Sequence, residues 1–298
     1  MGAAAQTPQL EVAALDAPLG VEVRGVDATR PPSPEVAEEL RRLVAEHCCV
    51  LLRGQDLTEE QHVAFAAGFG ETVVPWLHAV ELNTLARMRE LPGRPGYTGA
   101  VPGVVYFFNG PGYRDEPEDG YQQGWHADMT HVQVTLPLVF LHALEATGRG
   151  YETWLSNQYL AYERLDPATK ARVDALLIAH SFRHVFPNLP PVLHPVILTH
   201  PLSGRRSIFG IPGSAEAAPV GVPPEEAAPL MQKLTAHLED ERFYYKHAWR
   251  KGDILIWDNR CALHRRGPQV KGETRILRRV MAGDGPPDAL RRGFMGYA

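Results

Sequence analysis

Short apolar runs bounded by turn residues recur along the chain and outnumber the stretches with helical periodicity. These runs predict strands over residues 10–15, 21–26, 48–52, 104–108, 132–144, 152–155, 178–186, 196–198, 207–211, 243–249, 253–257 and 274–282. Helical periodicity with capping residues predicts helices over residues 33–47, 58–67, 166–177 and 223–238. The balance predicts a mainly β fold, a sandwich or barrel with helices packed against its outside.

The expected helices carry start signals of their own. Ser33 supplies a capping hydroxyl directly before Pro34, whose missing N–H costs nothing at the first helical position. Thr58 and Gln61 form a capping box, and Asp166 caps the next helix. The fourth helix begins with two prolines and two glutamates, and the acidic residues suit the positive end of the helix dipole. The helix positions are therefore predicted by local chemistry as well as by periodicity.

The composition, 44% hydrophobic and 22% charged over 298 residues, describes a globular protein. A formal net charge of −5 gives no basic excess to attract phosphates, so no nucleic-acid partner is expected. Three cysteines cannot form an extracellular disulfide framework, and no Lys or Arg precedes Arg24 to start a secretory signal. The longest nearly uncharged run is shorter than the ~20 residues of a membrane-spanning helix. We expect a cytoplasmic protein without a membrane partner, and homo-oligomerisation stays open.

Candidate chemistry begins at His126 and Asp128. In an extended segment, residues two apart point to the same side, so one metal ion could contact both. A His-x-Asp pair is weak evidence in a chain with 13 histidines, but His264 follows an apolar strand and offers a third ligand. Two histidines and one carboxylate that leave one face of the ion open are typical of a non-heme Fe(II) oxygenase. Four other histidines are interpreted as structural or surface residues and not as metal ligands: His131, His142, His180 and His200.

The irregular segment over residues 71–121 comes directly before these candidate ligands and is broken by many prolines and glycines. Such a segment is more typical of a loop that covers a substrate than of a linker between domains. We therefore expect a single domain over residues 1–298, with residues 71–121 as an active-site loop or lid.

The last predicted strand carries arginines in alternation. Arg275 and Arg279 share one face with the apolar Leu277, whereas Arg278 belongs to the other face. A buried guanidinium is costly unless it is paired with an anion, and its planar fork suits a carboxylate. If the first face is internal, two anions are implied. The alternative is that one or both arginines pair with internal Asp or Glu, or face solvent.

Several motifs occur together in one order along the chain. They are residues 19–27 (LGVEVRGVD), 50–55 (VLLRGQ), 69–71 (FGE), 125–128 (WHAD), 194–196 (HPV), 199–201 (THP), 252–260 (GDILIWDNR), His264 and 283–284 (GD). With this set the chain resembles the taurine dioxygenase/TfdA family of Fe(II)- and 2-oxoglutarate-dependent dioxygenases, nearly from end to end.

The resemblance implies a double-stranded β-helix, also called a jelly roll, and a cofactor set of Fe(II), 2-oxoglutarate as cosubstrate and O₂. It implies His126, Asp128 and His264 as iron ligands. Arg275 and Thr153 match the positions that bind the distal carboxylate of 2-oxoglutarate. Arg279 matches the position that faces the acidic group of the substrate in taurine dioxygenase, and whether it also reaches the cosubstrate stays open.

The chain departs from taurine dioxygenase where that enzyme contacts its substrate. An apolar stretch with Val74 and Trp76 replaces a substrate-binding histidine, and Gln122 stands in place of an asparagine. Taurine is therefore not the expected substrate. We expect a larger and more apolar pocket, with the alternative that Trp76 and Phe107 are plain core residues. The candidate pocket residues are Val74, Trp76, Phe107, Gln122, Met129, Phe186, Ile211 and Arg279.

These features predict an oxidoreductase that acts on a small, carboxylate-bearing organic substrate by hydroxylation, desaturation or epoxidation of an unactivated C–H group. Asp128 argues against halogenation, because halogenases of this type have lost that carboxylate. A narrower alternative is a tailoring enzyme of antibiotic biosynthesis acting on a terpenoid lactone acid, as pentalenolactone-type dioxygenases do. Outside this class stand a zinc hydrolase, for which no H-E-x-x-H motif is present, and a non-catalytic jelly-roll binding protein.

Overall fold

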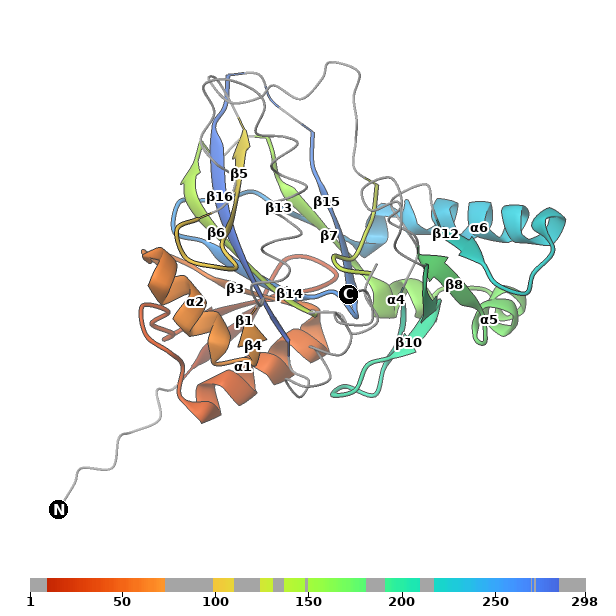
Figure 1. Ribbon diagram of the computed structural model, residues 1–298, viewed down its shortest axis with the longest axis horizontal. Helices are drawn as coiled ribbons and strands as arrows, with labels where there is room; N and C mark the ends of the chain where they lie inside the picture. The colour runs from red at the N-terminus through yellow and green to blue at the C-terminus, as the bar shows by residue number, and fades with distance from the viewer. Residues whose placement is uncertain are drawn as a thin grey trace.

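A large sheet and a smaller sheet lie face to face and enclose an apolar interior (Figure 1). The chain is seen in a computed structural model, which describes residues 10–72, 99–109, 124–130, 137–147, 150–180, 191–209, 217–268, 270 and 272–283. Strands β2 and β3 pair in parallel, and the other paired strands of these ranges run antiparallel.

The large sheet joins strands from both ends and from the middle of the chain. Its order is β1 (Glu11–Ala14), β2 (Val21–Arg24), β3 (Cys49–Leu52), β14 (Ile254–Asp258), β6 (Leu138–Ala146), β16 (Arg275–Gly283) and β4 (Glu71–Thr72), with β5 (Val105–Asn109) also paired to β16. The smaller sheet has the order β13 (Tyr244–His247), β7 (Thr153–Asn157) and β15 (Ala262–Arg266). Short ladders outside them are β10 (Ile197–Thr199) with β11 (Arg206–Ile208), and β12 (Ala217–Pro219), β8 (Leu177–His180) and β9 (Val192–Pro195) in that order.

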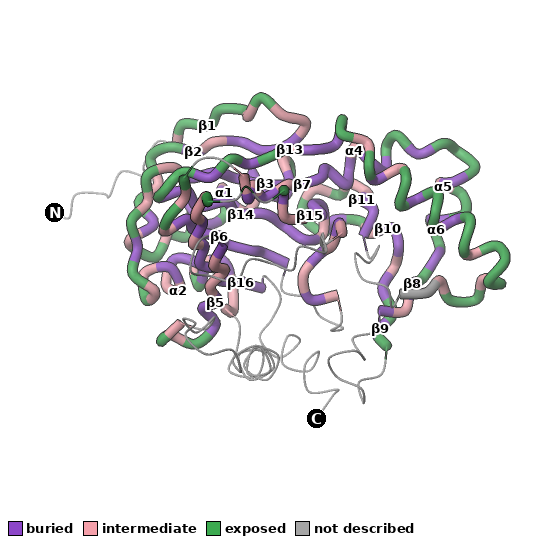
Figure 2. The backbone as a smooth tube through the Cα atoms, turned by 90° about the horizontal axis from the view of Figure 1, so that it is seen from above, coloured by how far each residue is buried: buried purple, intermediate pink, exposed green. Residues whose placement is uncertain are grey.

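Strand β14 shows how the sequence builds two cores at once. Its apolar run is buried throughout: Leu255 and Trp257 belong to the interior core, while Ile254 and Ile256 pack on the outer face of the large sheet. The interior core also contains Leu155 from the smaller sheet, so the two sheets share it. Figure 2 shows buried residues gathered along β14, β6 and β16.

Helices cover the outer faces of both sheets (Figure 1). The outer face of the large sheet packs against α1 (Pro34–His47) and α2 (Glu59–Ala67). The outer side of the smaller sheet contacts a second group: α4 (Gln158–Glu163), α5 (Pro167–Val173), α6 (Pro224–Leu238) and the 3₁₀ turn η1 (Glu241–Phe243). No helix within the described ranges is both long and apolar enough to cross a bilayer.

The predicted class, mainly β with flanking helices around facing sheets, is confirmed. The caps also form as expected: Ser33 Oγ accepts from Val36 N, and Thr58 and Gln61 exchange both bonds of the capping box. Cys48, Cys49 and Cys261 are buried and free. Several stretches of the predicted elements lie outside the described residues: 73–98 and 110–121 of the predicted lid, and 132–136, 181–186 and 210–211 of the predicted strands.

The helix predicted over residues 166–177 is shorter in the structure. It ends at Val173, because Leu176 N turns back to Val173 O and Leu176 O accepts from Val196 N, which aligns Leu177 with β9. The described elements that were not predicted are β4, β9, α4, β12, η1 and β15. Helix α4 is short and is capped by the side chain of Asn157, and β15 reads as a mixed run of apolar and basic residues.

A buried arginine ties α2 to the large sheet. Arg278 is only 3% exposed, and it donates to Leu57 O at 2.7 Å, to His142 Nδ1 at 3.1 Å and to His62 Nδ1 at 3.3 Å. Because arginine has no acceptor, both imidazoles must offer a lone pair and stay neutral. Burial, with the Arg278 charge as a further cause, lowers the pKa of His142 to about 4 and the pKa of His62 well below its usual value.

Replacing Arg278 with alanine should therefore destabilise the protein strongly. The change leaves a cavity and three buried acceptors without a donor, and we expect a loss of about 3 kcal/mol in the free energy of unfolding. Urea denaturation measures it. Arg24→Ala is the matched control, because Arg24 pairs with Glu22 at the surface and its loss should change little. Equal effects of the two changes would contradict the role given to Arg278.

The free energy of unfolding should also decrease as the pH falls through the range in which His142 differs in protonation between the folded and unfolded states. The unfolded histidine takes up a proton near pH 6.5, whereas the folded one resists until about pH 4. Between these values the unfolded state binds more protons, so the free energy of unfolding should decrease as the pH falls from about 6.5 to about 4. Urea denaturation at several pH values should give a shallower slope for His142→Gln than for the wild type; identical slopes would exclude His142 as a source.

Candidate active site

The segment with His126 is held directly against β15. His126 N donates to His264 O at 3.1 Å, and His264 N donates to His126 O at 2.9 Å, which forms an isolated antiparallel bridge. β15 in turn pairs with β7, where His264 lies opposite Leu155. The two imidazole rings come to 4.2 Å between centroids. Backbone pairing thus places two histidines from remote parts of the chain side by side.

Asp128 completes a cluster of three ligand atoms that lie within 4.8 Å of one another. Its Oδ1 is 3.8 Å from His126 Nε2 and 3.8 Å from His264 Nε2. Two atoms each bonded at about 2.1 Å to one ion lie at most about 4.2 Å apart, so the oxygen and either nitrogen can bind the same ion. The donor set of two imidazoles and one carboxylate suits Fe(II).

The ring nitrogens of both histidines are placed for metal binding. His126 Nδ1 lies 2.9 Å from Gly124 O, which can only accept, so Nδ1 is the donor and Nε2 is the ring nitrogen that faces Asp128 Oδ1. Burial, followed by the neighbouring His126, lowers the pKa of His264 to about 3, so this imidazole is neutral at physiological pH. The ring of Trp257 packs against His264 at 4.8 Å and restricts its rotation.

Arg279 binds the third ligand rather than standing apart from it. Its Nη1 donates to Asp128 Oδ2 at 3.0 Å, and its guanidinium lies 5.4 Å from the centroid of the Phe107 ring. The sequence left open that an internal Asp or Glu pairs with one of the two arginines, and Asp128 pairs in this way with Arg279. The pairing leaves Oδ1 of Asp128 directed at the two imidazoles.

Arg275 is buried on the same face of β16, as the alternation predicts. Its Nε and Nη2 donate to Asn109 Oδ1 at 3.2 and 2.7 Å, and its Nη1 donates to Tyr151 O. Both acceptors are neutral, so neither of them cancels the guanidinium charge. Thr153 is also buried, and its Oγ1 accepts from Trp249 Nε1 at 3.1 Å. Sequence reasoning missed Asn109 and Trp249, and the alternation of β5 opposite β16 is the signal that could have indicated Asn109.

Arg265, on the outer face of β15, packs against the segment that carries His126. Arg265 lies over Trp125 at 4.2 Å, Trp154 at 4.8 Å and Tyr244 at 5.4 Å from its guanidinium carbon to the ring centroids. Such stacks attract a cation and keep the rings in place. Trp125 is therefore fixed next to His126, a role that the sequence pattern did not indicate.

A second cluster of possible ligands, His200, Asp258 and Cys261, is fully buried. His200 Nδ1 accepts from Leu202 N and Ser203 N, so its Nε2 carries the proton and donates to Asp258 Oδ2 at 3.0 Å. Both nitrogens are used, which agrees with the interpretation of His200 as structural. Asp258 ends β14 and thereby anchors the turn that leads to His264.

The structure places only part of the predicted substrate pocket. Phe107 packs against the interior core close to Arg279, and Met129 is buried in that core with a left-handed backbone (φ 66°). Met129 directly follows Asp128, so the left-handed turn changes the direction of the chain right after the ligand. The other candidates lie outside the described residues: Val74, Trp76, Gln122, Phe186 and Ile211.

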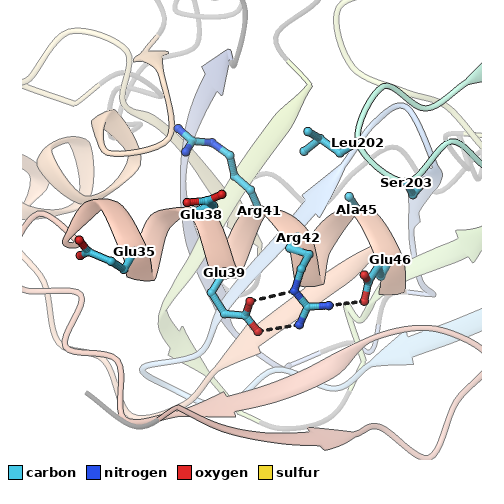
Figure 3. A pocket seen from close by; sticks show the side chains of 9 residues that line it. All are labelled: Glu35, Glu38, Glu39, Arg41, Arg42, Ala45, Glu46, Leu202 and Ser203. Atoms are coloured by element: carbon cyan, nitrogen blue, oxygen red, sulfur yellow. Dashed lines mark hydrogen bonds and ion pairs between the residues drawn. The ribbon is translucent and has the colours of Figure 1, made fainter. Parts of the chain in front are cut away.

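A hollow of about 430 Å³ lies away from this site, on the outer side of α1 (Figure 3). Its lining includes Glu35, Glu38 and Leu202, and Arg42 there bonds to Glu39 and Glu46. The three clustered ligands do not line it. The hollow is thus separate from the candidate metal-binding cluster.

Comparisons with known proteins relate nearly the whole chain to one family. Residues 11–281 match the family model described as taurine catabolism dioxygenase TauD, TfdA family. The chain is 28% identical over 290 residues to the (S)-phenoxypropionate/alpha-ketoglutarate dioxygenase of Sphingobium herbicidovorans, covering 91% of this chain and 94% of that protein. It is 24% identical over 296 residues to pentalenolactone F synthase of Streptomyces arenae, covering 89% and 92%.

Solved structures show the same fold. A crystal structure of a taurine dioxygenase from Burkholderia xenovorans superposes with a TM-score of 0.73 at 29% identity, covering 94% of this chain and 92% of that one. Since the family model spans nearly the whole chain, this protein belongs to the TauD and TfdA family, whose members are dioxygenases that use Fe(II), 2-oxoglutarate (α-ketoglutarate) and O₂.

Proposed function

We propose that this protein oxidises an unactivated C–H group of a small carboxylate-bearing molecule with an apolar body, by hydroxylation, desaturation or epoxidation. The observation that carries the proposal is the cluster of His126, Asp128 and His264 with Arg279 directly beside it. The cluster supplies the ligands for Fe(II), and Arg279 supplies a cation for an acidic substrate. Both lie against the interior core, whose apolar side chains pack beside them.

In this proposal the three clustered residues hold Fe(II), and Arg275 with Thr153 binds the distal carboxylate of 2-oxoglutarate. With O₂, the bound iron and cosubstrate supply the oxidising power, and 2-oxoglutarate leaves as succinate and CO₂. The protein positions the reactants. Asp128 is retained as a ligand, which favours oxygen transfer over halogenation. That residues 71–121 cover the substrate stays a prediction.

Arg279 can serve two anions at once. A guanidinium carries five N–H donors, more than the bond to Asp128 Oδ2 requires. The nearby Phe107 ring offers an apolar surface for the rest of a substrate. The relative named for (S)-phenoxypropionate takes a substrate of this kind, a carboxylate joined through an ether to an aromatic ring.

The second candidate is a tailoring reaction on a terpenoid lactone acid in antibiotic biosynthesis. It is favoured by the similarity to pentalenolactone F synthase, which extends over 89% of this chain. A zinc hydrolase and a non-catalytic binding protein do not fit a family of dioxygenases.

The proposed reaction predicts substrate-dependent succinate formation. Fe(II)-loaded protein is incubated with 2-oxoglutarate and a panel of acids with apolar bodies, each beside its methyl ester, together with sulfonates and terpenoid lactone acids. We expect succinate above background with acids and not with their esters, because an ester carries no charge for Arg279. If no compound gives succinate although the protein binds zinc normally, the dioxygenase proposal is refuted. Equal rates for acids and their esters would refute the carboxylate preference.

His264→Ala should abolish that succinate and weaken metal binding, measured by calorimetry with Mn(II), because one of three ligands is lost. His47→Ala is the matched control, since the His47 side chain is 43% exposed at the end of α1 and should leave both quantities unchanged. Retention of wild-type metal affinity in His264→Ala would remove His264 from the ligand set.

Arg275→Ala should raise the 2-oxoglutarate concentration needed for half-maximal rate by roughly 10- to 100-fold, because hydrogen bonds to a charged group contribute about 1.5–3 kcal/mol. The measurement is the rate of succinate formation against 2-oxoglutarate concentration. Arg206→Ala is the control, because Arg206 pairs with Asp174 near the surface. An unchanged dependence would remove Arg275 from its assigned role.

A further inference from the structure

Trp249 forms a buried hydrogen bond that the proposed chemistry does not yet use. Its indole Nε1 donates to Thr153 Oγ1 at 3.1 Å, and the two residues are 2% and 5% exposed. Trp249 belongs to the interior core together with Leu155, which lies on the same face of β7 as Thr153. The bond therefore lies inside the barrel, near the start of β7.

The direction of this bond is fixed by chemistry. An indole nitrogen only donates, so the threonine oxygen must accept. The hydroxyl keeps its proton and a second lone pair, and the proton must point away from the indole. Trp249 thereby fixes one lone pair of Thr153 Oγ1 and leaves the O–H to donate on another side.

The buried arginine assigned to the cosubstrate bonds to the same stretch of chain. Arg275 Nη1 bonds to the carbonyl of Tyr151, two residues before Thr153. A carboxylate offers only acceptors, so a hydroxyl lone pair facing it would repel it, and a hydroxyl proton facing it would bind it. The orientation of the Thr153 hydroxyl therefore matters to any carboxylate held by Arg275.

Trp249 is itself held in one orientation. The His247 ring packs edge-on against it, with centroids 4.4 Å apart and planes at 86°. His247 pairs with Thr153 across the β13–β7 ladder, and its Nδ1 lies 2.7 Å from Tyr245 Oη. Its Nε2 lies 3.2 Å from Asp253 Oδ2, and Asp253 is bound by Arg53. The indole can then hold the hydroxyl without reorganising when a ligand enters.

We infer that Trp249 is a positioning residue for the cosubstrate: its N–H orients the Thr153 hydroxyl to donate to the distal carboxylate of 2-oxoglutarate. This inference rests on the proposed function, because Thr153 and Arg275 are assigned to that carboxylate there. It also explains why a buried tryptophan and a threonine share a bond at this place in the barrel.

The test compares two ligands that differ at the distal end. Pyruvate has the same chelating 2-oxo acid group as 2-oxoglutarate and lacks the distal carboxylate. Calorimetry with Mn(II)-loaded protein gives the affinity of both ligands for the wild type, Trp249→Phe, Thr153→Val and the double variant. Trp249→Phe removes the N–H and keeps an aromatic ring. Thr153→Val removes the hydroxyl and keeps the side-chain shape.

We expect Trp249→Phe to weaken 2-oxoglutarate binding about 3- to 10-fold, the size of one hydrogen bond, and to leave pyruvate binding unchanged. In the Thr153→Val background the same change should have no further effect, because no hydroxyl remains to be oriented. Tyr162→Phe is the matched control: it also removes one hydrogen-bond donor and keeps an aromatic ring, but the lost bond goes to Asp174 at the end of α5, and both affinities should match the wild type.

Equal losses for both ligands, or a full additional loss in the Thr153→Val background, would overturn the inference and leave Trp249 with a packing role alone. If Trp249→Phe fails to fold, 3-benzothienylalanine at position 249 replaces the N–H with sulfur in a ring of the same size, and the same expectations apply. A wild-type protein that binds no 2-oxoglutarate overturns the proposed function as well. Binding in the wild type that is lost only in Thr153→Val overturns the role of Trp249 alone.

Discussion

The pair of backbone hydrogen bonds between His126 and His264 is the constraint on which the site depends. The two histidines come from distant parts of the chain, yet the bridge brings their ring centroids to 4.2 Å from each other. Backbone pairing is less tolerant of displacement than side-chain contact, because both bonds must form together. Asp128 lies in the turn that directly follows the bridge, and its Oδ1 comes to 3.8 Å from Nε2 of both histidines. The candidate ligand set thus combines one backbone bridge with the turn beside it.

Strand β16 shows how one element separates two tasks. Arg275 and Arg279 point into the barrel. Arg275 donates to Asn109 and to the carbonyl of Tyr151, and Arg279 donates to Asp128. Arg278, on the opposite face, joins α2 to the sheet through His62 and His142. The strand alternation thus keeps Arg278 on one side of the sheet and the two arginines of the candidate site on the other. A shift of register by one residue would exchange these roles.

Much of this was predictable from residues alone. The strand alternation places Arg275 and Arg279 on one face, and the spacing of His126, Asp128 and His264 with the ordered motifs indicates the metal cluster and the family. The partners of these residues were not predictable. Asn109 and Trp249 matter through tertiary register, and Arg278 is buried because α2 covers it, which a strand pattern does not show. Helix α4 is too short for periodicity, and α5 ends early because of a contact with Val196.

Strand β14 has a consequence for how the protein acquires its function. It is paired on one edge with β3, from near the beginning of the chain, and on the other with β6, from the middle. These pairings join residues far apart in sequence, and such contacts form slowly because a long loop must close first. His264 follows β14 by one tight turn, so it reaches its place only once the early, middle and late parts of the chain have assembled. A newly made chain is therefore expected to acquire metal affinity late, together with its global fold, and a truncated or partly folded chain would not hold an exposed redox-active ion.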